Sequence, residues 1–175
     1  MKKTLIGIAA ASLLMLGTAA QAQQAKPPVY GEIGYSMIEN DDLKFGVLRG
    51  IIGADLHPNV AVEGMLGLGV KDDSFTAFGT TFDAKIKNMV GVYAKPKFNV
   101  TPELELFGRV GFTRINIEAS VGGASASDAD SDLSYGVGLN YNITPTVHIG
   151  VDYMNYYDKD GSKFDGVTVG VGFRF

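Results

Sequence analysis

The sequence predicts an all-β fold, an eight-stranded antiparallel up-and-down barrel that spans a membrane. Three observations lead to this prediction: an N-terminal export signal, apolar residues at every second position in eight segments, and connections that alternate between short and long. A tilted membrane-spanning strand needs about ten residues, and the strand number of a closed bacterial barrel is even.

The first 22 residues have the organisation of a cleaved signal peptide. Two lysines follow the initiator methionine, an apolar stretch covers residues 5–16, and the small-x-small motif Ala-Gln-Ala ends at Ala22. The apolar stretch is too short to cross a bilayer as a helix. We therefore expect export through the general secretory pathway, removal of residues 1–22, and a single barrel domain formed by residues 23–175.

The composition excludes two classes of function. Two of the 15 basic residues lie in the signal, which leaves 13 basic and 19 acidic residues and a net charge of −6. An acidic chain with scattered lysines is unsuited to binding nucleic acid. The sequence contains no cysteine, so disulfides and thiol chemistry play no part.

Bulky apolar residues alternate with glycine, polar and charged residues in eight segments of the remaining chain. These segments are residues 29–37, 48–56, 60–70, 86–95, 104–113, 134–141, 147–153 and 167–175. In the fourth segment, for example, Ile86 and Val90 share the apolar face and Lys87 lies on the other. Alternation of this kind indicates β-strands with one apolar face.

The connections between these segments differ in length. Short turns with proline and asparagine lie at residues 57–59, 99–102 and 142–145. Longer polar loops lie at about residues 39–43, 71–81, 118–132 and 157–164. Proline restricts φ and asparagine bonds to nearby backbone, so both favour tight turns. Short turns at one end and longer loops at the other are typical of an outer-membrane barrel with both termini in the periplasm.

We expect the apolar face to point outward into lipid, because the interior of an eight-stranded barrel is only wide enough for side chains to fill it. An unbroken apolar belt facing water would be unfavourable for a soluble monomer. The alternative with the same period is a soluble periplasmic ligand-binding barrel with an apolar cavity.

Aromatic residues at both ends of the outward face suggest two girdles at the membrane interfaces. These residues are Phe112, Tyr135 and Tyr153 near the loops, and Phe98, Tyr141 and Phe173 near the turns.

The inward face carries charged residues of both signs. They are Glu32, Arg49, Glu63, Lys87, Lys95, Glu105, Arg109, Asp152 and Arg174. A narrow interior holds few water molecules, so these charges must pair with one another. The pattern predicts a salt-bridge network that fills the lumen. The alternative is a gate whose ion pairs exchange, which would make the chain a narrow passive pore of low conductance.

The last segment contains Val167, Val169, Val171, Phe173 and the terminal Phe175, which look like the C-terminal signature of outer-membrane barrels. With the signal, the strand count and the turn pattern, this makes the chain resemble the small barrels of the OmpX, OmpA-barrel and opacity-protein type. We expect a monomer in the bacterial outer membrane, in contact with lipid and lipopolysaccharide. The resemblance implies that the barrel assembly machinery recognises the terminal strand. It does not imply one activity, because such barrels include adhesins, immune-evasion proteins and narrow pores.

The sequence predicts neither an enzyme nor a bound cofactor or metal. His57 lies in a turn and His148 points inward, so neither shares an outer-leaflet position with a serine, as lipid-modifying catalysis would need. Two acidic stretches, residues 128–132 and 158–161, resemble fragments of calcium loops. Both lack the full set of ligands and the closing glutamate, so solvated turns are the better interpretation.

The loops offer the remaining candidates for a binding surface. Phe75, Phe78 and Phe82 form an aromatic set that could contact other surfaces. Alternation also continues through residues 82–86 and 114–117, whose edges could pair with a partner strand. We expect a non-catalytic outer-membrane barrel that serves envelope integrity or surface interaction.

Overall fold

The computed structural model describes residues 28–40, 43–77, 80–121, 124–159 and 161–175. The predicted signal peptide lies outside these residues, and so does Phe78. The side chains of Phe75 and Phe82 are also outside the described part. No helix in the described ranges is long and apolar enough to cross a membrane.

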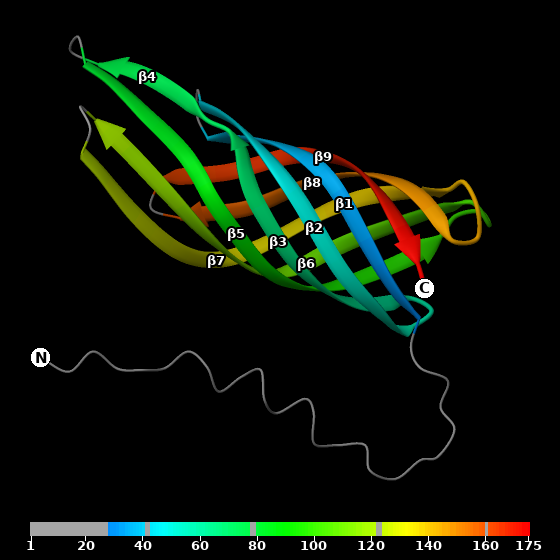
Figure 1. Ribbon diagram of the computed structural model, residues 1–175. Helices are drawn as coiled ribbons and strands as arrows, with labels where there is room; N and C mark the ends of the chain where they lie inside the picture. Colours follow the sequence, from blue (N-terminus) through cyan, green and yellow to red (C-terminus); the bar gives the residue numbers. More distant parts are fainter. Residues whose placement is uncertain (1–27, 41–42, 78–79, 122–123, 160) are drawn as a thin grey trace, which may run out of the picture.

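The described chain forms antiparallel strands (Figure 1). They are β1 (Val29–Asn40), β2 (Leu43–His57), β3 (Val60–Lys71), β4 (Asp73–Ala77), β5 (Thr80–Asn99), β6 (Leu104–Val121), β7 (Ala124–Asn142), β8 (Val147–Lys159) and β9 (Ser162–Arg174). The strands pair in chain order, except that β3 pairs with β5 and not with β4. β4 follows β3 after one residue, Asp72, and pairs with the upper part of β5 as an extension of the same wall. Because β1 pairs with β9 and β3 pairs with β5, the sheet closes into the predicted eight-stranded barrel.

The short turns and the C-terminus lie at one end of the barrel (Figure 1). The connections at the other end are shorter than the sequence suggested. Most of residues 71–81 and 118–132, expected as loops, belong to strands, and β6 pairs with β7 as far as Val121 and Ala124. Small and polar side chains tolerate water on both faces, so the backbone ladder continues beyond the apolar belt. Gly161 in the β8–β9 turn has a φ of 81°, which glycine adopts without strain.

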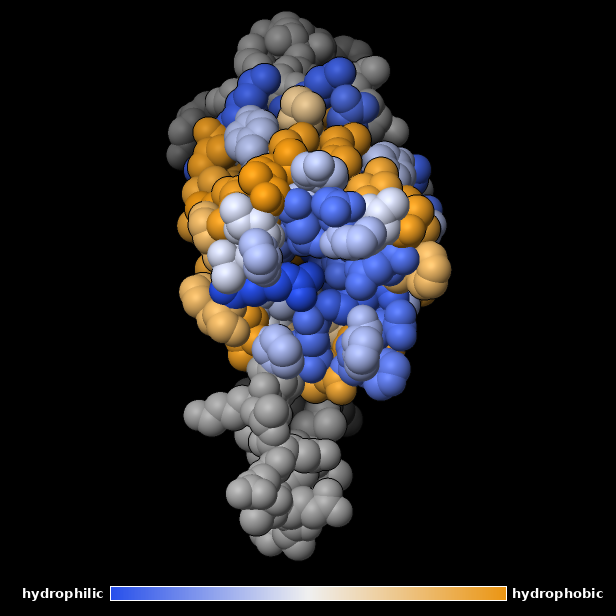
Figure 2. All heavy atoms as spheres, turned by 90° about the vertical axis from the view of Figure 1, so that its right-hand side faces the viewer, coloured by the Kyte–Doolittle hydropathy of each residue, from blue (hydrophilic) through white to orange (hydrophobic). Residues whose placement is uncertain are grey.

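The outer surface of the barrel is apolar. Ile33, Ile52, Leu66, Val92 and Val169 are each more than half exposed on it. Figure 2 views the end with the short turns and shows hydrophilic residues gathered in the middle, with hydrophobic residues on the flanks. The prediction that the apolar face of the strands points outward is therefore confirmed.

The interior has two layers of different chemistry. The half near the short turns contains the buried charged residues, which we call the charged layer. The half near the loops contains a buried apolar cluster, which we call the apolar cap. The cap consists of Ile38, Phe45, Val47, Ile51, Met65, Ile86, Met89, Tyr93, Ile115, Met154, Tyr156 and Phe164. The cap is absent from the sequence-based prediction, in which the inward face is polar throughout.

A β-bulge in β5 corrects one of the predicted positions. The register between β5 and β6 shifts between Ile86 and Asn88. A bulge inserts one extra residue and so exchanges the two faces of the strand beyond it. Ile86 is therefore 1% exposed inside the barrel, whereas Lys87, which we expected in the lumen, is exposed and bonds to Glu118.

Candidate functional site

Arg109 and Arg49 occupy the centre of the charged layer. The Arg109 guanidinium donates to Asp152 Oδ2 at 2.7 Å, to Glu32 Oε2 at 3.3 Å and to Glu63 Oε2 at 2.5 Å. Arg49 donates to Glu32 Oε1 and to Asp152 Oδ1, both at 2.8 Å. The five side chains come from β1, β2, β3, β6 and β8, so they join opposite walls of the barrel. Planar guanidinium groups suit this arrangement because they can bind several carboxylates at once.

Lys95 is held by both carboxylate and aromatic groups. Its Nζ lies 3.3 Å from Glu63 Oε1 and 3.8 Å from Glu105 Oε1. The same nitrogen is 4.3 Å from the centre of the Phe107 ring and 5.0 Å from that of Tyr30. Cation–π contacts of this length stabilise an ammonium group that has lost water.

The charged layer continues to the end with the short turns. Lys97 Nζ donates to Asp55 Oδ1 at 2.6 Å and lies 3.6 Å from Glu105 Oε2. Arg174, whose side chain is 29% exposed, lies 3.3 Å from Asp55 and 3.5 Å from Glu105. Arg174 is thus the member of the layer that reaches toward solvent at this end.

The structure brings together the residues predicted for the lumen, with Lys87 as the exception. It adds Asp55 and Lys97, which the sequence analysis did not select. Both lie on the inward face of their strands. Asp55 is an even number of residues from Arg49, and Lys97 is two residues from Lys95. The alternation of inward and outward positions along each strand was therefore the sequence signal that could have identified Asp55 and Lys97. With these two residues the charged layer has five acids and five bases, and its formal charges cancel.

The apolar cap lies directly on the charged layer. Arg49 Nη1 donates to the hydroxyl of Tyr156 at 3.2 Å, so this tyrosine belongs to both. Tyr93 packs in the cap, and its hydroxyl shares a hydrogen bond of 2.5 Å with Thr113 Oγ1. Tyrosine suits this boundary because its ring packs with apolar residues while its hydroxyl bonds to polar ones.

The two histidines lie apart near the end with the short turns. His148 is buried against Gly172, where a Cβ atom would lie 2.2 Å from the imidazole ring. Neither ring nitrogen of His148 has a hydrogen-bond partner in the described part of the chain. His57 Nδ1 accepts from the backbone N of Asn59 at 3.3 Å in an exposed turn. Across the described ranges, no group of three or more His, Cys, Asp or Glu side chains is arranged to hold a metal ion.

The residues predicted for the aromatic girdles all lie on the outer surface and are between 45% and 63% exposed. In the predicted terminal signature, Val167, Val169, Phe173 and Phe175 are exposed, and Val171 is half-buried. The backbone N of Phe175 donates to Val29 O at 2.9 Å, next to the ladder between β9 and β1. The roles of these residues in membrane anchoring and assembly stay predictions.

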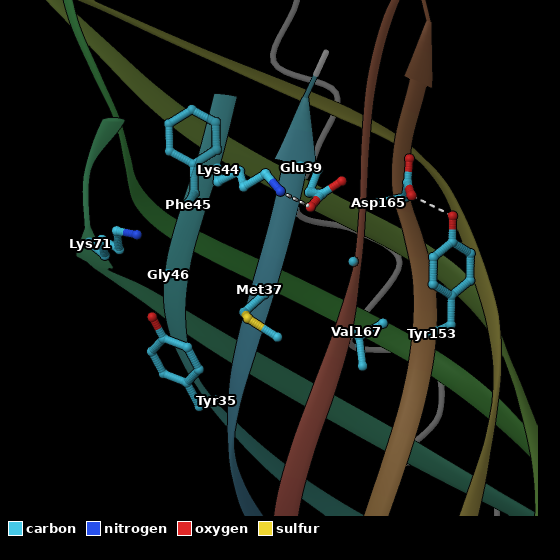
Figure 3. Close-up of a pocket in the computed structure, with 11 residues that line it drawn as sticks. Tyr35, Met37, Glu39, Lys44, Phe45, Gly46, Lys71, Tyr153, Asp165 and Val167 are labelled. Carbon is cyan, nitrogen blue, oxygen red and sulfur yellow. Dashed lines mark hydrogen bonds and ion pairs between the residues drawn. The ribbon is translucent and has the colours of Figure 1, made fainter. Parts of the chain in front are cut away.

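A hollow of about 280 Å³ opens on the outer surface across β2, β1, β9 and β8 (Figure 3). Apolar and charged side chains meet in it: Met37 and Val167 lie beside the Lys44–Glu39 ion pair of 3.1 Å. Tyr35 covers Gly46 so closely that a Cβ atom there would lie 2.1 Å from the tyrosine hydroxyl. The hollow therefore lies at the border of the apolar belt that is nearer to the loops.

A second group of charges lies outside the barrel on β5 and β6. Lys85 Nζ and Lys87 Nζ are each 2.8 Å from a carboxylate oxygen of Glu118. Hydrogen bonds from these lysines lower the pKa of Glu118 to about 2, so the carboxylate stays ionised in mildly acidic medium. Arg114 is exposed on the same face of β6, beside Val90 of β5. Bases therefore outnumber acids in this group.

Comparisons with known proteins agree with this geometry. The attachment invasion locus protein of Yersinia enterocolitica is 26% identical over 183 residues, which cover 100% of both chains. The crystal structure of Ail, the attachment invasion locus protein of Yersinia pestis, matches with a TM-score of 0.62 at 21% identity, over 87% of this chain and 100% of that one. The N-terminal β-barrel domain of Pseudomonas aeruginosa OprF matches with a TM-score of 0.64 at 18% identity and the same coverage. Both structures share the barrel fold.

A family model gives the more specific result. The model described as "Outer membrane protein beta-barrel domain" matches residues 7–175. A soluble periplasmic barrel, the alternative with the same alternation, is thereby excluded. The chain belongs to the family of outer-membrane β-barrel domains and is a protein of the bacterial outer membrane.

Proposed function

We propose that this protein is a non-catalytic outer-membrane barrel with a closed lumen, which serves envelope integrity or surface interaction through its outer wall and its extracellular strands. The observation that supports a closed lumen is the stacking of the apolar cap on the charged layer. An ion in transit would have to separate paired charges and then cross an apolar constriction, and each step is costly.

The proposed partners of the outer wall are lipid and lipopolysaccharide. Lys85, Lys87 and Arg114 lie toward the loop end of the apolar belt, which supports contact with lipid phosphates at that border. The hollow of Figure 3 lies at the same border and has room for part of a headgroup. A crystal structure of Ail from Yersinia pestis is a complex with the heparin analogue sucrose octasulfate. For the present chain we propose the phosphates of lipopolysaccharide as the anionic partner.

Two further proposals concern the terminus and the oligomeric state. Exposed Phe175 at the end of β9 supports recognition of this strand by the barrel assembly machinery. The paired β1–β9 seam supports a monomer, because the barrel closes without strands from another chain.

Conductance in planar lipid bilayers tests the closed lumen. We expect the refolded protein to give no discrete channel openings, and we expect Arg109→Ala to be equally silent, because the apolar cap still covers the lumen. A matched variant with Met65→Ala and Met89→Ala in addition removes apolar side chains from the cap and should give openings. Heat-modifiable gel mobility shows that each variant is folded.

The competing function is a narrow passive pore. In that case the unmodified protein should show openings, and Arg109→Ala or Glu63→Ala alone should change their conductance. Such a result would refute the closed lumen without affecting the family assignment.

A further inference from the structure

Residues 124–134 of β7 have a backbone ladder on one side only. The ladder between β6 and β7 continues to Val121 and Ala124, but the ladder between β7 and β8 ends at Tyr135 and Asn155. Figure 1 shows the β6–β7 hairpin extending beyond the β8–β9 hairpin. An unpaired edge of this length can pair with a strand of another molecule.

This edge is not where the sequence suggested. Residues 114–117 of β6 pair with β5 on one side and with β7 on the other. Asp83 and Ala84 of β5 pair with both β4 and β6. The edge hypothesis is therefore wrong for residues 114–117 and for Asp83 and Ala84, and a longer unpaired edge lies on the next strand along the sheet.

Three carboxylates occupy the backbone amides of the β7 edge. The amide of Ala129 donates to Asp128 Oδ1 at 2.8 Å, and that of Ser131 donates to Asp130 Oδ1 at 2.7 Å. The amide of Leu133 donates to Asp132 Oδ1 at 2.8 Å. The spacing of two residues places all three amides on the same edge of the strand. A pairing strand needs these donors, and here they are already satisfied.

The second oxygens of these carboxylates face β8. Asp132 Oδ2 accepts from the backbone N of Asp158 at 2.9 Å. Asp130 Oδ2 accepts from the Tyr157 hydroxyl at 3.0 Å and lies 3.3 Å from Lys159 Nζ. Side chains thus bridge the gap between β7 and β8 in place of a backbone ladder. The arrangement fixes the carboxylates beside the amides they occupy.

We propose that Asp128, Asp130 and Asp132 shield the β7 edge and prevent it from pairing with the same edge of a second copy of this chain. A second copy is the relevant partner because neighbouring copies in one membrane present this edge at the same height. The shield has two parts: the amides are already bonded, and two edges brought together would place six carboxylates close to one another. The proposal does not depend on whether the lumen conducts.

Disulfide trapping tests the proposal, since the sequence contains no cysteine. Ser127→Cys places one thiol on the part of the edge beyond the bonds to β8, where paired strands bring Cα atoms to within about 5.5 Å, the range for a disulfide. Under mild oxidation this parent variant should stay monomeric in detergent and in vesicles. Adding Asp128→Ala, Asp130→Ala and Asp132→Ala should raise the disulfide dimer about tenfold, because freed edge amides can then pair.

Two matched variants identify the cause. The corresponding triple asparagine variant keeps an acceptor oxygen for each amide but loses the repulsion between carboxylates, so it should form more dimer than the parent and clearly less than the triple alanine variant. Asp72→Ala removes an exposed acid away from this edge and should have no effect. The proposal fails if the triple alanine variant is folded yet as monomeric as the parent. It also fails if the asparagine or the Asp72 variant dimerises as strongly as the triple alanine variant.

Amide exchange gives a second measurement that does not require dimerisation. In the parent protein the Ser131 amide should exchange slowly although no strand pairs with it. Asp130→Ala should increase its exchange rate about tenfold, since a broken hydrogen bond exposes the amide to water. An unchanged rate would show that the carboxylate does not occupy the amide.

Discussion

Arg109 shows how much one side chain of the charged layer contributes. It is 2% exposed and bonds to carboxylates from β1, β3 and β8. Its removal would leave Glu32, Glu63 and Asp152 buried with fewer cationic partners. Removing one partner of a buried ion pair costs more free energy than the intact pair contributes to stability, because the remaining charge stays desolvated.

We expect Arg109→Ala to lower the free energy of unfolding by about 3–5 kcal/mol, the usual cost of an uncompensated buried charge. Arg114→Ala, in the same strand but exposed on the outer surface, should change it by no more than about 0.5 kcal/mol. Urea unfolding in lipid vesicles measures both. Equal effects of the two variants would show that the charged layer does not stabilise the barrel.

At the scale of single elements, β5 shows where alternation fails as a predictor. The pattern from Val90 to Lys95 gave the correct faces, because each residue there pairs regularly with β3 and β6. Beyond Asn88 the bulge reverses them. The local sign of the extra residue is polar Asn88 at an apolar position, followed by apolar Met89 at a polar one. The bulge results from pairing with β6, which is distant in the sequence.

The bulge predicts opposite effects at adjacent positions. Ile86→Ala should cost about 2–5 kcal/mol of stability, because it leaves a cavity in the apolar cap. Lys87→Ala should cost no more than about 0.5 kcal/mol, because the lysine is exposed. Equilibrium unfolding of the two variants checks this. The reverse order would place Lys87 inside and contradict the bulge.

For the whole molecule, the sequence predicted the membrane-embedded half well and the extracellular half poorly. Lipid requires an apolar outer face and a paired polar interior, and both requirements leave a period of two in the sequence. Above the membrane water contacts the outer wall, so the faces of a strand need not differ in polarity. Residues 124–132 therefore read as a polar loop although they form part of β7. The apolar cap is hard to predict from the sequence because its residues come from seven strands, one to three from each.

The orientation of the barrel follows from its two ends and can be tested with single cysteines. Ser162→Cys lies in the β8–β9 turn and Val100→Cys in the β5–β6 turn, at opposite ends. A membrane-impermeant maleimide should label Ser162→Cys on intact cells. It should label Val100→Cys only after the outer membrane is permeabilised. Labelling of Val100→Cys on intact cells would mean that the barrel is inserted the other way round.

The two-layer interior also implies a direction of assembly. The cap residues Phe45, Ile86 and Phe164 lie toward the loop end of the barrel, so they can pack together only after their hairpins have crossed the bilayer. The charged layer, in contrast, can pair while the strands are still closing within the membrane. The extracellular half should therefore be the last part of the barrel to become rigid, and its packing would make the crossing hard to reverse.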